Sequence, residues 1–252
     1  MGGALEDLIV PMLLLSFVAG FATTLGAFVV LWWPNLQPQK LSAFLGFASG
    51  VMIVVVALDL LPTAWQWGGL GAMATGFVMG FIVIAIADLL LTRLTRSTLG
   101  NGTMAPLRKM GYLIAIGISL HDFPEGIAIA AGAAAEVHLG WVVALAIGLH
   151  NIPEGIATAA PLRMSGLRAW KIILLTVIMS LFTPLGTLLG FGLLAISTEV
   201  LAQLIALAGG AMVYLVWDEL WPEARKNSPF WAYTGALIGA LCMVAVSFIH
   251  HH

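Results

Sequence analysis

The sequence predicts an all-α membrane protein that crosses the bilayer several times as a single domain over residues 1–249. Of its 252 residues, 61% are hydrophobic and 9% are charged, whereas soluble domains carry about 25% charged residues. The apolar residues form long continuous runs, which favours helices over the alternating pattern of barrel strands. The three residues 250–252 are all His, and we interpret them as the remnant of a purification tag.

Eight apolar runs reach the roughly 20 residues that a membrane-spanning helix needs. They cover residues 8–32, 41–63, 69–91, 108–134, 139–162, 169–196, 201–221 and 229–249. The connections between them are short, and the longest covers about residues 92–107. The chain is therefore expected to form a bundle of eight membrane-spanning helices.

The basic residues predict how this bundle is oriented. With eight helices, all ten Lys and Arg fall on one side of the membrane: Lys40, Arg93, Arg96, Arg108, Lys109, Arg163, Arg168, Lys171, Arg225 and Lys226. Basic residues gather on the cytoplasmic side of membrane proteins. We therefore expect both termini on the non-cytoplasmic side.

Two regions of the chain share a pattern at a constant offset of 160 residues. The segments 48–52 (ASGVM) and 59–64 (DLLPTA) match 208–212 (AGGAM) and 219–224 (ELWPEA). The pattern relates the first three predicted helices to the last three. Because five helices separate the copies, the two copies have opposite orientations in the membrane. Inverted repeats of this kind are typical of alternating-access transporters.

A second repeat lies in the central pair of predicted helices. Residues 121–130 read HDFPEGIAIA, and residues 150–159 read HNIPEGIATA. In each copy a His and a Glu stand four residues apart, which places both on one face of a helix. The short connection near residue 136 brings the two copies to the same depth, near the bilayer centre. The polar side chains that converge there are His121, Asp122, Glu125, His150, Asn151 and Glu154.

Imidazole, carboxylate and amide groups together suit Zn²⁺, and also Fe²⁺, Mn²⁺ or Cd²⁺. The three carboxylates offset the charge of one divalent cation and have the capacity for two. A simpler interpretation is that each His and Glu form a local ion pair that only packs the bundle. Two copies at matched depth in lipid argue against it, because ionisable residues inside a membrane are costly and mark functional sites.

These motifs resemble those of the Zrt/Irt-like (ZIP) family of divalent-metal transporters, in a form similar to its bacterial GufA-like branch. The resemblance covers nearly the whole chain, including the pattern shared by the second and seventh predicted helices. It implies uptake of Zn²⁺ or a similar ion through the cell (inner) membrane into the cytoplasm, with metal ligation by the six residues above. It also implies a homodimer in which helices 1, 4, 5 and 6 move against helices 2, 3, 7 and 8. In some members, a Glu directly before the proline of helix 6 is a ligand of a second metal site. This sequence has Thr183 at that position, so whether the site binds one ion or two stays open.

Two other functions use the same residues. A metal ion with an open position could activate water in an intramembrane metalloenzyme, although the sequence has no HExxH or GxSxG motif. A cation channel is the third hypothesis, and the inverted repeat favours a carrier over it. We expect no enzyme activity, no organic cofactor and no nucleic-acid partner. Proton coupling stays open at this stage.

Overall fold

The structure is a computed structural model, which describes residues 2–33, 37–98, 105–135, 137–193 and 198–250. Every regular element within those ranges is helical. The elements are α1 (Gly2–Trp32), α2 (Pro38–Val55), η1 (Val56–Leu60), α3 (Leu61–Thr98), α4 (Ala105–Ala135), α5 (Val137–Met164), α6 (Ala169–Ser180), α7 (Phe182–Leu193), α8 (Thr198–Tyr214), η2 (Leu215–Leu220), α9 (Trp221–Asn227) and α10 (Pro229–His250). His250 ends α10, whereas His251 and His252 of the expected tag remnant lie outside the described residues.

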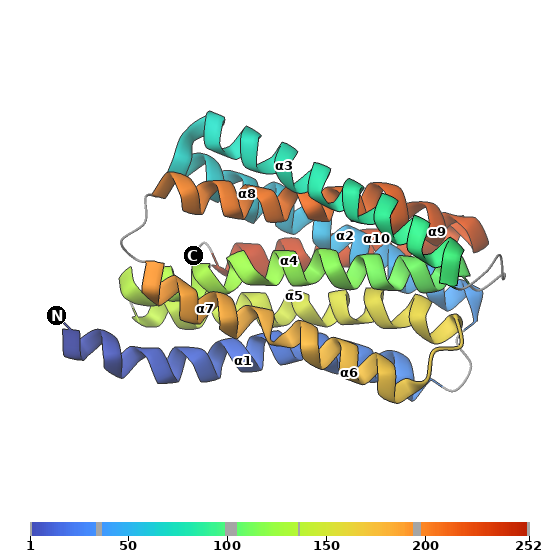
Figure 1. The fold of residues 1–252 in the computed structure, drawn as a ribbon, viewed down its shortest axis with the longest axis horizontal. Helices are drawn as coiled ribbons and strands as arrows, with labels where there is room; N and C mark the ends of the chain where they lie inside the picture. The colour runs from blue at the N-terminus through green and yellow to red at the C-terminus, as the bar shows by residue number, and fades with distance from the viewer. Residues whose placement is uncertain (1, 34–36, 99–104, 136, 194–197, 251–252) are drawn as a thin grey trace.

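The helices run side by side along one long axis (Figure 1). The start of α1, the end of α4 and the start of α5 lie at the same end, which we call the terminal end. The end of α3, α9 and the connection between α5 and α6 lie at the opposite end. α4 and α5 run through the middle of the bundle in opposite directions.

Within the residues that the structure describes, seven helices are long and apolar enough to cross a membrane, which confirms an all-α, multi-pass membrane protein. Their limits are Leu8–Trp32, Pro38–Arg93, Pro106–Ala134, Gly140–Met164, Ala169–Gly192, Thr198–Lys226 and Pro229–Val246. The difference from the expected eight lies in Pro38–Arg93, which contains both predicted spans 41–63 and 69–91. Its backbone departs from helical geometry at Gly69 (φ 73°, ψ 179°), in the region that glycine adopts without strain.

Two short π-helical segments, η1 and η2, interrupt the regular helices. Each is followed two residues later by a proline, Pro62 or Pro222, whose nitrogen cannot donate a hydrogen bond. The N–H of Leu61 donates to the carbonyl of Val56, five residues earlier, which widens the turn ahead of the proline. The two segments end 160 residues apart, at Leu60 and Leu220.

The expected span 169–196 is two helices, α6 and α7, separated at Leu181. Pro184 lies one turn after Ser180 and cannot donate to its carbonyl, so the regular ladder stops there. The N–H of Leu181 instead donates to the carbonyl of Ile178, at 3.2 Å. Residues 194–196 of the predicted span lie outside the described residues.

Close backbone contacts join α1, α4, α5, α6 and α7 into what we call the first group. A Cβ added to Gly155 of α5 would meet the backbone of Thr23 in α1. A Cβ added to Gly126 of α4 would meet the backbone of Thr183 in α7. Small residues of this kind let membrane helices approach closely.

The remaining helices form the second group: α2, η1, α3, α8, η2, α9 and α10. A Cβ on Gly50 of α2 would meet the backbone of Ala236 in α10, and one on Gly80 of α3 would meet the backbone of Leu207 in α8. Gly117 of α4 lies at the contact between the two groups. A Cβ on this residue would have only side-chain atoms of Leu215 in η2 as its nearest neighbours.

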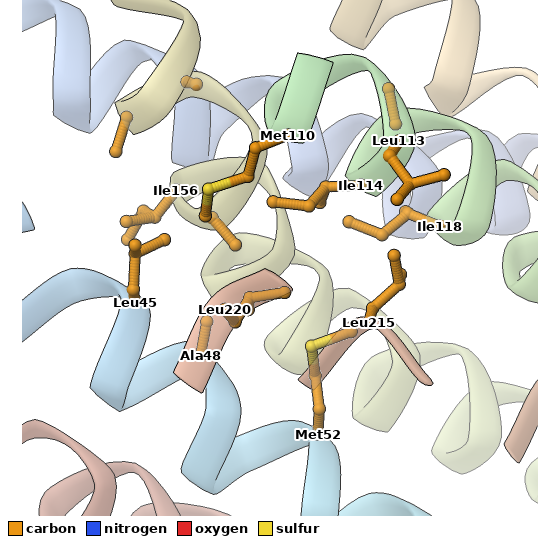
Figure 2. Packing of buried hydrophobic residues seen from close by; sticks show 14 of the residues in the cluster. Leu45, Ala48, Met52, Met110, Leu113, Ile114, Ile118, Ile156, Leu215 and Leu220 are labelled. Carbon is orange, nitrogen blue, oxygen red and sulfur yellow. The ribbon is translucent and has the colours of Figure 1, made fainter. Parts of the chain in front are cut away.

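The largest apolar cluster fills the space between the two groups toward the opposite end of the bundle. Figure 2 shows side chains of α4 facing those of α2 and η2 there. The members labelled in it are Leu45, Ala48, Met52, Met110, Leu113, Ile114, Ile118, Ile156, Leu215 and Leu220. All are buried, so this side of the inter-group space is closed by packing.

Candidate metal centre

The six polar residues of the two central motifs gather where α4 and α5 cross the middle of the bundle. Their exposed fractions range from 0% to 5%: His121 0%, Asp122 0%, Glu125 5%, His150 5%, Asn151 0% and Glu154 1%. The i, i+4 spacing within each motif puts His and Glu on the same helix face. The antiparallel packing of α4 and α5 then brings the two faces together.

Glu125 links the two motifs. Its Oε1 lies 2.6 Å from Nε2 of His150, on the other helix, and 2.8 Å from Nε2 of His121, on its own helix. The Oε1 of Glu154 lies 3.6 Å from Nε2 of His121. The two imidazole rings are tilted by 40° with centroids 6.1 Å apart. Each motif therefore contributes side chains to one shared cluster.

The cluster holds more acceptors than donors. Both carboxylate oxygens of Asp122, both of Glu154 and the Oε2 of Glu125 are buried without a hydrogen-bond partner. Carboxylates that lack a proton only accept hydrogen bonds, so these groups cannot satisfy one another. Buried polar atoms without partners are costly, and a bound cation is one way to satisfy several carboxylates at once.

Two overlapping sets of side chains have spacing suited to a metal ion. His121, His150 and Glu154 form one set, and His121, Asp122 and Glu125 form the other. Within each set, the candidate ligand atoms all lie within 4.8 Å of one another. Nitrogen and carboxylate oxygen ligands in this number are typical of Zn²⁺ sites.

Asn151 is held in place by α1. Its Nδ2 donates a hydrogen bond to the carbonyl of Ala19 at 3.0 Å. The amide oxygen has no hydrogen-bond partner and is buried. The amide orientation therefore leaves its oxygen available as a ligand.

A local ion pair within each helix does not account for this arrangement. The contact of His121 with Glu125 fits that simpler interpretation. Glu125 also contacts His150 across the helix pair, however, and a one-to-one pairing leaves Asp122 without a basic partner. A buried charge without a partner is strongly destabilising. A cluster with only a structural role would therefore be expected to hold equal numbers of acidic and basic groups.

A cavity of about 270 Å³ leads from the cluster toward the terminal end. Glu125 and His150 lie in its wall at the deep end. Asp59 of η1 and two polar residues of α3, Thr63 and Gln66, line the facing wall. Since α4 and α5 belong to the first group and η1 and α3 to the second, the cavity separates the two groups.

Two other acidic residues, Asp88 and Glu219, lie away from the cluster, at the opposite end. Asp88 of α3 and Glu219 of η2 both contact Lys109 of α4. No sequence motif predicts these contacts of Lys109. Thr183 lies at the contact of α7 with α1, where its Oγ1 is buried without a hydrogen-bond partner.

Comparisons with known proteins agree with the fold and the motifs. A family model described as ZIP zinc transporter matches residues 95–247. A zinc transporter ZupT of Corynebacterium glutamicum is 34% identical over 254 residues, covering 93% of this chain and 97% of that protein. The zinc transporter ZupT of Escherichia fergusonii is 34% identical over 242 residues, covering 93% of both chains. That of Chlorobium phaeovibrioides is 33% identical over 258 residues, covering 95% of this chain and 97% of that protein.

These relatives are full-length matches, and the family is one of transporters. The predicted assignment to the GufA-like branch stays a prediction, since the relatives above are named ZupT. The chain itself belongs to the ZIP family of zinc transporters.

Proposed function

We propose that this protein carries Zn²⁺, or a similar divalent cation such as Cd²⁺, Fe²⁺ or Mn²⁺, across the cell (inner) membrane. The observation that carries the proposal is the buried cluster of His121, Asp122, Glu125, His150, Asn151 and Glu154. It has unpaired acceptor atoms and is reached by a cavity from the terminal end. The relatives named zinc transporters favour Zn²⁺ among these ions.

We propose that the chain crosses the membrane eight times, within one domain over residues 1–249. Pro38–Arg93 contains 56 residues, which would make a straight helix about 84 Å long. The hydrocarbon core of a bilayer is about 30 Å thick. A single crossing cannot bury that length, and the break at Gly69 gives the turn between two crossings.

We infer that transport occurs by alternating access between the two groups of helices. Two observations support this mechanism. Backbone contacts at glycines join helix pairs within each group, such as α1 with α5 and α3 with α8, whereas a cavity separates the two groups toward the terminal end. η1 and η2 recur at the 160-residue offset of the sequence repeat, and inverted repeats accompany this mechanism in other transporters. The first group contains helices 1, 4, 5 and 6 of the family's moving unit.

The charges at the two ends support an orientation of the bundle, and the family resemblance implies the direction of transport. Arg163, Lys171 and Lys226 lie in elements whose ends are at the opposite end of the bundle (Figure 1). Basic residues favour the cytoplasmic side, so the terminal end and the cavity face the outside. The proposed movement is uptake into the cytoplasm. The homodimer implied by the family resemblance remains a prediction.

Zinc uptake into proteoliposomes of the purified protein tests this function. Saturable uptake is expected for the unmodified chain, and Glu125→Ala should reduce it to the level of empty liposomes, since Glu125 contacts both imidazoles. Glu223→Ala is the matched control, because Glu223 lies in α9, away from the cluster, and uptake should persist.

Each other outcome has a distinct meaning. Equal uptake by the unmodified protein and Glu125→Ala would exclude this cluster as the transport site. Tight zinc binding without uptake would instead favour the metalloenzyme alternative. Conductance far above a carrier's rate, without saturation, would favour a channel. A pH-sensitive dye inside the liposomes reports proton coupling in the same experiment.

A further inference from the structure

Lys109 forms the polar contact that joins the two groups at the opposite end. It lies in the second turn of α4, in the first group, and its ammonium contacts the carboxylate of Asp88 in α3. Its Nζ also lies 3.0 Å from Oε1 of Glu219 in η2. Both acidic residues belong to the second group, so one side chain bridges three elements.

This contact is partly shielded from solvent. The side chains of Lys109, Asp88 and Glu219 are 21%, 17% and 11% exposed. The hydroxyl of Tyr214 donates a hydrogen bond to Oδ2 of Asp88 at 3.1 Å, which holds that carboxylate in place. Ion pairs with several partners contribute more than isolated exposed pairs.

The position of the contact relates it to the apolar cluster. Met110 follows Lys109 directly in α4, and Leu220 follows Glu219 directly in η2; both belong to the cluster of Figure 2. The ion pairs therefore border the packed side of the inter-group space. Any movement that separates α4 from η2 there must also separate Lys109 from Glu219.

We propose that Lys109 is a latch: its ion pairs with Asp88 and Glu219 hold the packed side closed while the cavity at the terminal end is open. The proposal rests on the alternating access inferred above. In the transport cycle, Lys109 leaves these carboxylates when the packed side opens. Its role is to set the balance between the two states, without touching the ion in the metal centre.

Cysteine accessibility tests the latch. In a Cys242→Ser background, a Leu215→Cys reporter lies in the packed side and should react slowly with N-ethylmaleimide, because Leu215 is 0% exposed. Lys109→Met removes the ion pairs and keeps a long side chain. We expect it to raise the labelling rate about fivefold. This is the change in the ratio of the two states expected from the loss of one favourable, partly exposed ion pair.

Lys226→Met is the matched control. Nζ of Lys226 lies 3.3 Å from Oε2 of Glu223 in the same short helix, so that pair joins no two groups. Its loss should leave the Leu215→Cys labelling rate unchanged. A second reporter, Ala128→Cys in the cavity wall, separates the latch from general loosening. Loosening raises labelling of both reporters, whereas loss of the latch raises only that of Leu215→Cys.

A conservative substitution provides the rescue control. Lys109→Arg keeps a positive charge beside both Asp88 and Glu219, so labelling of Leu215→Cys should stay slow. An unchanged labelling rate in Lys109→Met, or a rise at both reporters, overturns the latch. Labelling requires no transport, so this result is independent of zinc uptake; failure of uptake alone would count against the proposed function only.

Discussion

The space between the two groups of helices differs on the two sides of the metal centre. Toward the terminal end it is a cavity of about 270 Å³. Toward the opposite end the same space is filled by buried apolar side chains (Figure 2). The ion pairs of Lys109 border this packed side. The change from open to packed occurs at the level of the six polar residues.

Individual helices show the same change along their length. In α4, Ile118 lies in the packed cluster and Ala128 lines the cavity, with His121, Asp122 and Glu125 between them. In α5 the order is reversed, as expected for an antiparallel helix: Ile147 lines the cavity and Ile156 lies in the cluster. The central cluster is thus bordered by a cavity on one side and by packed side chains on the other, an arrangement that fits the alternating access proposed above.

Filling the cavity should have the largest effect. Ala128→Trp places an indole in the wall of the only route described to the centre, so zinc uptake into proteoliposomes should fall to background. Leu145→Trp adds similar bulk to a residue of α5 that is 67% exposed, and uptake should persist. Undiminished uptake by Ala128→Trp would mean that the ion uses another path.

Removing side-chain volume from the packed side should lower the free energy of unfolding. Ile118 is 1% exposed in the cluster, and Ile118→Ala should lower the free energy of unfolding by about 2–5 kcal/mol. Thermal unfolding in detergent measures the loss. Ile82→Ala, at a position of α3 that is 49% exposed, should change it by less than about 0.5 kcal/mol. Equal losses at both positions would show that the cluster is not tightly packed.

Glycine substitutions compare helix contacts within a group with those between groups. Their effects on the free energy of unfolding should be smaller than that of Ile118→Ala. Gly80→Ala would meet the backbone of Leu207 and should lower the free energy of unfolding by about 1–3 kcal/mol. Gly117→Ala meets the end of the Leu215 side chain, which can turn away, so the loss should be smaller. Gly71→Ala enters open space and should stabilise by up to about 1 kcal/mol. The reverse order would contradict the two-group description.

The sequence predicts the helical class and the membership of the central cluster, because both depend on local patterns. Continuous apolar runs require helices in lipid. The i, i+4 spacing of His121 with Glu125, and of His150 with Glu154, requires each pair to share a helix face. These features do not depend on how the helices pack against one another.

Features that depend on neighbouring elements could not be read from the sequence. Pro184 interrupts the predicted span 169–196, yet proline also occurs inside α4 and α5 without ending them. The contact of Glu125 with His150 depends on the register of α4 against α5. The partners of Lys109 depend on how α4 lies against α3 and η2, which no local pattern specifies.

Binding of the ion among these six residues is tested most directly by X-ray absorption spectroscopy at the zinc edge of the zinc-loaded protein. It predicts nitrogen and oxygen ligands at about 2.0–2.1 Å, with the outer-shell signature of imidazole, and loss of that signature in the double variant His121→Ala, His150→Ala. Sulfur among the ligands, or an unchanged spectrum in the variant, would contradict it.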